Sequence, residues 1–352
     1  MIIVLIIIAL SSIYVLFNWS GGNDEPSTIN LNRQSSSIDH LDVQVTPLSE
    51  EEFEEFLGMV GFLVWPGIEN TLEEDFPDGY YGDIALTSPQ DVLTAGIHNG
   101  SDALDFILKV FYNYEEIPFQ VLGAEDYDTE FLFSLEFGYR IDIPFQLDEN
   151  LGVSDTTSKL TVGVFVAPDR FSMFDDELFN ADYALALNFE IDYGSDDLLV
   201  LPVEEADVIH SEAFTYAGVL VNQDFAPYDS DLYEGNFRLP PNPVQANPGE
   251  EIELAFVANA SGIINEPVDS YVIISMLDWH QIDMNGKPYF LVRKEEGNET
   301  AGQHGRFSII APDEPGFYEF AAIIIPNPTT RRSINNFFPL DAAWRFTIEV
   351  LE

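Results

Sequence analysis

The first nineteen residues constrain this chain most, because they decide which solvent surrounds the rest of the protein. Residues 1–17 carry no charged side chain, and the aliphatic run extends from Ile2 to Leu10. An apolar stretch of about 17–25 residues is long enough to cross a bilayer as one helix. We therefore expect residues 1–19 to form a transmembrane anchor, with a signal sequence as the alternative.

The residues after this segment indicate its orientation. Asp24 and Glu25 follow it, and the first basic residue is Arg33, so no positive cluster holds the carboxyl side in the cytoplasm. Residues 20–47 are rich in Ser, Asn, Gly and Asp, which predicts a flexible tether. We expect a single-pass protein of the cell membrane with an extracellular C-terminal part.

The charge is strongly acidic. The chain has 62 Asp and Glu against 13 Lys and Arg, a net charge of −49. Carboxylates repel one another over a Debye length of about 8 Å at physiological salt and about 3 Å in molar salt. This favours a protein of a halophile, most simply an archaeal one, and excludes nucleic acid as a ligand of the bulk surface.

The composition still predicts folded domains. Hydrophobic residues make up 46% of the chain and aromatic residues 13%, which is enough for a sizeable core, and there is no Cys to form a disulfide. The length beyond the anchor suits two domains. The Pro-rich and Asn-rich residues 239–249 mark the boundary, giving domains at 48–238 and 239–352.

The first domain is predicted to be α+β with an antiparallel sheet. Ser49 and Glu52 have the spacing of a capping box, so a helix is expected to begin there and to end by Trp65. A second helix is expected to start at Ser88 and a third to cover 101–112. Alternating apolar residues predict strands at 129–144, 158–167, 181–193 and 213–221.

The second domain shows regular strand patterns, and the chain as a whole is predicted to be mainly β. The expected strands are 250–258, 271–277, 280–284, 287–293, 305–311, 316–325 and 343–350. Asn285-Gly286 is a typical two-residue hairpin turn between two of them. Seven short strands in this length predict an immunoglobulin-like sandwich.

Two motifs carry a family resemblance over residues 240–352. Pro248-Gly249-Glu250, followed by apolar residues at every second position, resembles the opening of Ig-like or CARDB-type domains of archaeal and bacterial surface proteins. Residues 311–320 resemble the E–F corner of such domains, which implies that Tyr318 is the corner tyrosine. Phe320 stands where antibody domains carry a cysteine, so the resemblance implies no inter-sheet disulfide.

Candidate ligand sites are acidic loops. Asp229, Asp231 and Glu234 form the best candidate for calcium, which prefers carboxylate oxygens, although no loop matches the EF-hand pattern. Asp278 and His280 are a second candidate pair of metal ligands, which would need a third ligand from elsewhere, and the alternative is a strand end with a solvated His. We predict no other cofactor.

No nucleophile elbow, zinc-protease helix or phosphate loop is present in the sequence. Sequons at Asn99, Asn259 and Asn298 are expected in loops and suit an exported glycoprotein. We therefore expect a non-enzymatic surface protein that binds a protein or envelope partner. The alternatives are an ectodomain enzyme or solute-binding protein with its site in 48–238, and a self-assembling envelope or virion component.

Overall fold

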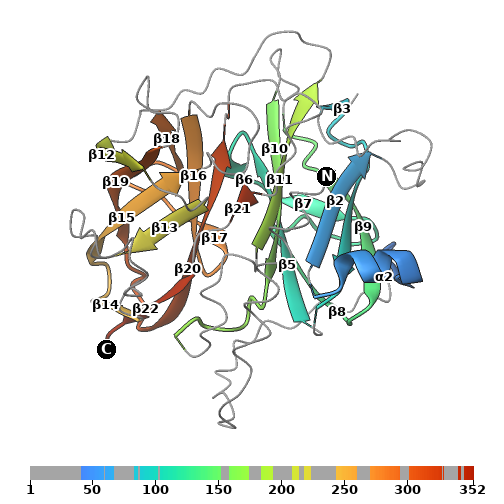
Figure 1. The fold of residues 1–352 in the computed structure, drawn as a ribbon, viewed down its shortest axis with the longest axis horizontal. Coiled ribbons are helices and arrows are strands. Elements are labelled where there is room, and N and C mark those ends of the chain that lie inside the picture. Colours follow the sequence, from blue (N-terminus) through green and yellow to red (C-terminus); the bar gives the residue numbers. More distant parts are fainter. Residues whose placement is uncertain are drawn as a thin grey trace.

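The described residues of the chain form four β-sheets that stack as successive layers (Figure 1). The structure is a computed structural model. It describes residues 41–58, 60–66, 83–85, 88–101, 104–151, 158–173, 184–192, 208–213, 218–222, 243–259, 270–293, 301–326, 328, 340–341 and 345–352. Within these ranges the fold is mainly β, with one short helix, α2 (Glu50–Phe56).

Sheets A and B form the first sandwich. Sheet A consists of β1 (Gln44–Pro47), β2 (Val60–Pro66), β4 (Leu93–Asn99), β7 (Phe119–Val121) and β9 (Tyr139–Leu147), all antiparallel. Sheet B consists of β3 (Asp83–Ala85), β5 (Leu104–Tyr112), β6 (Glu115–Glu116), β8 (Glu130–Leu135), β10 (Ser158–Val166), β11 (Ala184–Asp192) and β21 (Leu340–Asp341). The pairing of β3 with β11 is parallel, and the other pairings in sheet B are antiparallel.

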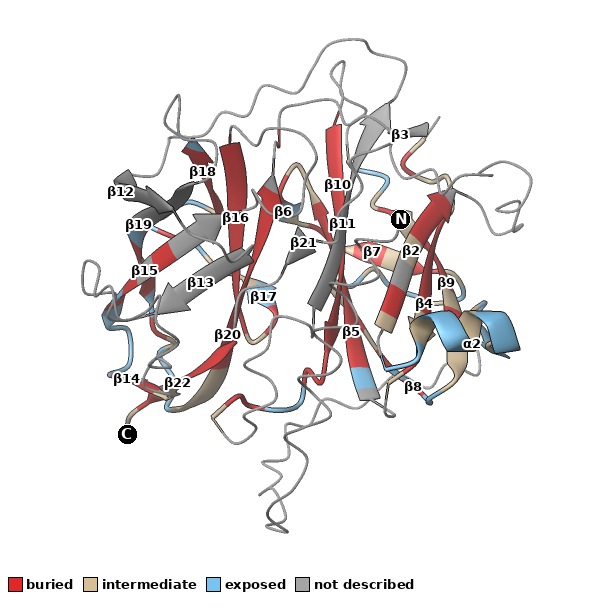
Figure 2. Cartoon of the chain, viewed as in Figure 1, coloured by how far each residue is buried: buried red, intermediate tan, exposed pale blue. Residues whose placement is uncertain are grey.

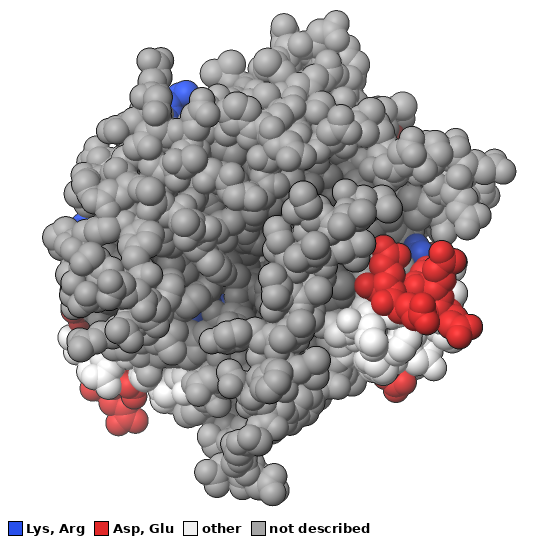
Figure 3. All heavy atoms as spheres, viewed as in Figure 1, with Lys and Arg blue, Asp and Glu red and all other residues white. Residues whose placement is uncertain are grey.

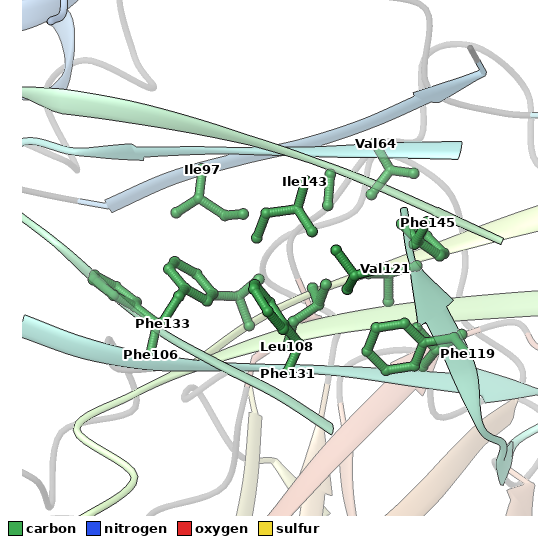
Figure 4. Close-up of a cluster of buried hydrophobic side chains, with 14 of the residues drawn as sticks. Val64, Ile97, Phe106, Leu108, Phe119, Val121, Phe131, Phe133, Ile143 and Phe145 are labelled. Atoms are coloured by element: carbon green, nitrogen blue, oxygen red, sulfur yellow. The ribbon is translucent and has the colours of Figure 1, made fainter. Parts of the chain in front are cut away.

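The core of the first sandwich lies between these two sheets. Ile97, Ile143 and Phe145 of sheet A meet Phe106 and Leu108 of sheet B (Figure 4). Phe133 of β8 is also buried in this layer, and its ring stacks on Phe106 with centroids 5.3 Å apart. Burying a large apolar side chain contributes about 1.5–3 kcal/mol, so this layer is a major source of stability.

Sheets C and D form the second sandwich. Sheet C consists of β14 (Val244–Ala246), β16 (Ser270–Leu277), β17 (His280–Gln281), β18 (Tyr289–Arg293), β20 (Gly316–Pro326) and β22 (Phe346–Val350). Sheet D consists of β12 (Val208–Ala213), β13 (Gly218–Asn222), β15 (Glu251–Asn259) and β19 (Ala301–Ile310). Leu254 and Phe307 of sheet D pack against Ile273, Phe320 and Ile348 of sheet C.

A third apolar layer joins the two sandwiches, because the outer faces of sheets B and C pack against each other. Ile107, Phe111 and Phe165 of sheet B belong to the same buried cluster as Ile274 and Ile323 of sheet C. Every residue of β10 and of β16 is buried in consequence. Figure 2 shows the buried strands β10, β16 and β20 in the middle of the molecule.

Three strands pair with strands on the other side of the sequence position that was expected to separate the domains. Strands β12 and β13 precede residue 239, yet they pair with β19 and β15 in sheet D. Strand β21 follows residue 239, yet it pairs with β11 in sheet B. The strands are therefore exchanged between the two halves of the sequence, and the two sandwiches share chain segments.

The helix predictions are partly wrong. Ser49 and Glu52 do form a capping box at the start of α2, and the helix ends before Trp65 as expected, but it has only seven residues and strand β2 follows it. Residues 88–91 form a turn in place of a helix start. Residues 104–112 are strand β5.

The misassignment of β5 has a physical cause. Its even-numbered residues, such as Phe106, face the first core, and its odd-numbered residues, such as Ile107, face sheet C. A strand buried on both faces loses the apolar–polar alternation and reads as a continuous apolar run, which a helix pattern can also fit.

The predictions for residues 239–352 agree well with the structure. The expected strands correspond to β15 to β20 and β22, although β17 and β18 are shorter than expected. Asn285 and Gly286 both have positive φ, and Met284 and Lys287 exchange backbone hydrogen bonds across them, as in a two-residue hairpin turn. The Tyr318 hydroxyl donates to the Glu314 carbonyl at 2.8 Å, which confirms the tyrosine corner.

The membrane prediction falls outside these ranges. The expected anchor, residues 1–19, is not among the described residues, and no described helix is long and apolar enough to span a bilayer.

We predict that Trp279→Ala destabilises the whole molecule. Trp279 is buried between the sandwiches, where it contacts Phe165 and donates through Nε1 to the Pro168 carbonyl at 2.9 Å. The substitution should lower the free energy of unfolding by about 3–5 kcal/mol, measured by calorimetry in concentrated KCl. The control Ile310→Ala, at a position that is 63% exposed, should change it by less than about 0.5 kcal/mol. Equal effects of the two substitutions would contradict the buried contact.

Candidate functional site

The predicted calcium ligands Asp229, Asp231 and Glu234 lie outside the described residues, so that site stays a prediction. In the part of the chain that the structure describes, no group of three or more His, Asp or Glu residues is arranged to hold a metal ion.

Asp278 and His280 do not form a joint site. Asp278 and Trp279 both have positive φ and make the tight turn between β16 and β17. The Asp278 carboxylate accepts from the Glu319 backbone N–H at 3.3 Å, whereas the His280 ring lies 3.8 Å from Glu116 and 4.0 Å from Glu130. The two side chains therefore have different partners.

A buried ion pair ties β22 and β20 to the first sandwich. Arg345 and Glu319 are 3% and 2% exposed, and the guanidinium Nε donates to Glu319 at 3.1 Å. The other guanidinium nitrogens donate to the carbonyls of Val166, Ala167 and Arg170, which follow or end β10.

The remaining contacts of this pair are also satisfied. Glu319 accepts from the Ser172 N–H and from the Thr347 hydroxyl, and the Arg345 guanidinium lies 4.7 Å from the Trp279 ring centroid. Burial raises the pKa of Glu319, while the charge of Arg345 acts in the opposite direction. Because these groups satisfy one another, the pair is best explained as a structural link between the sandwiches.

A second polar link joins β6 to β17. The Glu116 N–H donates to the Gln281 amide oxygen at 2.6 Å, and the Gln281 N–H donates to the Glu116 carboxylate at 2.9 Å. Lys109 is fully buried and forms ion pairs with Glu116 and Glu130. Burial alone would raise the pKa of Glu116, but its contacts with His280 and Lys109 outweigh burial, and the pKa lies below its usual range.

The strongest candidate for a binding site is a polar cluster on the outer face of sheet A, which we call the sheet A cluster. Its members are Glu52, Trp65, His98, Arg140 and Asp142. His98 of β4 lies directly opposite Arg140 of β9 in the sheet register. Arg140 Nε donates to Asp142 at 2.7 Å, and its guanidinium lies 5.0 Å from the Trp65 ring centroid.

Two glycines and helix α2 shape this face. A Cβ atom on Gly96 would clash with the Trp65 indole, and one on Gly61 would clash with the Phe56 ring. Phe56 of α2 lies edge-on to His98, with ring centroids 4.7 Å apart. The missing side chains therefore allow the aromatic rings to lie close to the sheet, and α2 covers one end of the cluster.

The titratable groups of the sheet A cluster are perturbed. Burial, helped by the charge of Arg140, lowers the pKa of His98 from 6.5 to about 4. Burial raises the pKa of Asp142 against the effect of Arg140, and hydrogen bonds from Ser49 lower the pKa of Glu52. Perturbed groups that gather in one place are typical of functional sites.

Three buried polar atoms of the sheet A cluster have no hydrogen-bond partner among the residues that the structure describes. They are Trp65 Nε1, His98 Nδ1 and Arg140 Nη2. An unsatisfied buried polar group costs about 1–3 kcal/mol, so this concentration on three neighbouring strands favours a ligand-binding role. His98 stays neutral at pH 7 because its pKa is about 4. The cluster can therefore offer a ligand hydrogen bonds and the charge of Arg140, but His98 does not gain or lose a proton near pH 7.

The sequence reasoning missed this site. His98 belongs to no sequence motif, and Arg140 was part of an expected strand. No local motif links Trp65, His98 and Arg140, because they come together through the β2–β4–β9 pairing alone. The outward side of β4 could have been found by alternation, since Ala95 and Ile97 face the core and Gly96 and His98 face outward.

Asn99 corrects the expectation of a loop sequon. It is the last residue of β4 and fully buried, its amide donates to the Leu135 carbonyl at 2.7 Å, and its side-chain oxygen accepts from Ser101. A sugar cannot be attached to this amide in the folded protein.

No family model and no curated protein matches the chain. Solved structures similar to it include a CARDB domain from Pyrococcus furiosus, at 12% identity and a TM-score of 0.21, covering 38% of this chain and 94% of that one. They also include the C-terminal domain of the Streptococcus pyogenes antigen I/II-family protein AspA, at 7% identity and a TM-score of 0.22, covering 89% and 100%. The Escherichia coli chaperone DraB is similar at 10% identity and a TM-score of 0.23, covering 83% and 97%.

A CARDB domain, the type of domain that residues 240–352 resemble in sequence, is among these structures. At such low TM-scores, the description of this chain as two β-sandwiches rests on its own strand pairing and on the Tyr318 corner.

We predict that Arg345→Met costs about 3–5 kcal/mol of unfolding free energy, because Glu319 is then left buried without its partner. The matched control is Arg306→Met, whose pair with Glu253 is exposed and should contribute at most about 1 kcal/mol. The double variant Arg345→Met/Glu319→Leu should recover part of the loss in chemical denaturation. A single variant as stable as the control would show that the ion pair is not buried.

We predict that His98 makes stability depend on pH. Its pKa is about 4 in the folded chain and 6.5 in the reference state, so the unfolded chain binds more protons between these values. The free energy of unfolding should therefore fall as pH drops from about 6.5 to about 4. His98→Gln should flatten this part of the curve, as followed by chemical denaturation at a series of pH values. Parallel curves for wild type and His98→Gln would refute this assignment.

Proposed function

We propose that the chain is a membrane-anchored, non-enzymatic binding protein on the surface of a halophile, with residues 1–19 as its anchor. The sheet A cluster carries the proposal. It combines perturbed groups, buried unpartnered donors and a covering helix on an outer face, and its chemistry is that of binding.

The arrangement of the sandwiches supports this role. The apolar layer between sheets B and C, together with the Arg345–Glu319 pair, holds both sandwiches as one body. A binding site on sheet A would then be presented on a stiff scaffold, which lowers the entropy lost when a partner binds.

The net charge of −49 supports an environment of high salt. In molar salt the Debye length is about 3 Å, so repulsion between neighbouring carboxylates is largely screened. The proposed protein or envelope partner would be recognised by short-range contacts under these conditions.

The location can be tested with a single engineered thiol, because the chain has no Cys. Glu352 is exposed at the end of the described chain, and Glu352→Cys provides a unique label site. A membrane-impermeant maleimide added to intact cells in growth-strength brine should label this variant, and the labelled chain should stay in the membrane fraction. Labelling that requires cell lysis would refute an extracellular location.

A further inference from the structure

Three apolar side chains, two exposed and one half-buried, lie on and next to α2 and form what we call the α2 patch. The patch consists of Phe53, Leu57 and Phe137, of which Leu57 is 61% exposed and Phe137 is 44% exposed. The rings of Phe53 and Phe137 meet edge-on with centroids 5.1 Å apart. The Leu48 N–H donates to the Gly138 carbonyl at 2.8 Å, which fixes the β8–β9 turn beside the start of α2.

Carboxylates surround the α2 patch. Its rim is formed by five exposed residues, namely Glu50, Glu51, Glu54, Glu55 and Glu136. Figure 3 shows acidic side chains gathered over α2, beside a patch of uncharged atoms. None of the residues of the patch or its rim is basic.

Helix α2 contributes to this surface rather than to the core. It buries none of its seven residues, so its formation contributes little to the core. Glu50 and Glu54, and likewise Glu51 and Glu55, lie four residues apart, and like charges at this spacing destabilise a helix by about 0.2–0.5 kcal/mol per pair. The capping box of Ser49 and Glu52 compensates for this repulsion at the first turn.

Three of the four large apolar side chains that are exposed among the described residues lie at this end of the first sandwich. Val45 is on β1, Leu57 follows α2, and Phe137 is in the β8–β9 turn, whereas Ile310 is at the end of β19 in the second sandwich. Single exposed apolar residues need no explanation, but a cluster rimmed by charge is typical of an interaction site.

We propose that the α2 patch docks a segment of a partner protein that combines aliphatic anchors with Lys or Arg side chains. This assignment rests on the proposed binding function and specifies the chemistry of the partner. The charge of the rim decides between occupants, because a second copy of this chain or an anionic lipid would bring like charges against the five glutamates.

The salt concentration determines how much the apolar contacts and the charged contacts each contribute to the affinity. At a Debye length of about 3 Å, glutamates attract only basic groups in direct contact, so the apolar anchors carry most of the affinity in brine. At lower salt the rim should contribute more. The contributions of Leu57 and of the glutamates to the binding affinity therefore change in opposite directions, relative to each other, as the ionic strength changes.

The test uses the full chain and a fluorescein-labelled octapeptide of alternating Leu and Arg, with binding followed by anisotropy in about 3 M KCl. Octapeptides of alternating Leu and Glu, and of Gly and Arg, serve as comparisons. The Leu–Arg peptide should bind, the Leu–Glu peptide should bind more weakly, and the Gly–Arg peptide, which has no apolar anchor, should not bind. Leu57→Ser and Phe137→Ser should each weaken binding about tenfold, which is about 1.4 kcal/mol.

The matched control is Ile310→Ser, at a position as exposed as Leu57 but in the other sandwich, and it should leave binding unchanged. Glu54→Gln/Glu55→Gln should weaken binding more at about 1 M than at about 3 M KCl. Far-UV circular dichroism should show that all variants keep the fold.

Several results would overturn the assignment. They are the absence of Leu–Arg peptide binding, equal binding of the Leu–Glu peptide, and equal losses for Leu57→Ser and Ile310→Ser. Self-association of the chain that Leu57→Ser abolishes would assign the patch to a second copy instead. Labelling of Glu352→Cys on intact cells reports location independently of the patch, so failure of peptide binding and failure of the surface location are distinguishable.

Discussion

The packing of sheet B against sheet C is the interaction on which the rest of this structure depends. It buries the outer faces of sheets B and C. The two sandwiches therefore form one body of four sheet layers. Polar groups reinforce it at both ends, through Arg345 and Glu319 near the end of β10 and through Glu116 and Gln281 between β6 and β17. Such an arrangement suits a chain with no disulfide and a net charge of −49, because its stability comes from apolar burial that salt does not screen.

The same contact explains where sequence reasoning succeeded and where it failed. The Tyr318 corner, the Asn285-Gly286 turn and the capping box of Ser49 are local signals, and each was predictable from a few adjacent residues. Strand β5 was misread as a helix because both of its faces are buried and Ile107 and Phe106 serve different cores. The exchange of β12, β13 and β21 across residue 239 was unpredictable from composition, since strand pairing is not encoded by local turn chemistry.

The sheet A cluster and the α2 patch lie at the opposite side of the first sandwich from this contact. This placement follows from the order of the layers. Sheet B is buried on both faces, whereas sheet A has an outer face, on which His98 and Arg140 lie. Trp65, His98 and Arg140 belong to three strands that are distant in sequence, so only the fold reveals the cluster. Helix α2 connects the two features, with Phe56 over His98 and Phe53 beside Phe137.

The most direct test of this account is the distance between the two sandwiches in solution. Because the chain has no Cys, spin labels attach only at engineered cysteines. Glu136→Cys in the first sandwich and Ile310→Cys in the second provide two exposed sites. Pulsed electron paramagnetic resonance in concentrated KCl should give one narrow distance distribution, as expected for sandwiches held by a buried contact. A broad or multimodal distribution would show that the sandwiches move independently and would contradict the account.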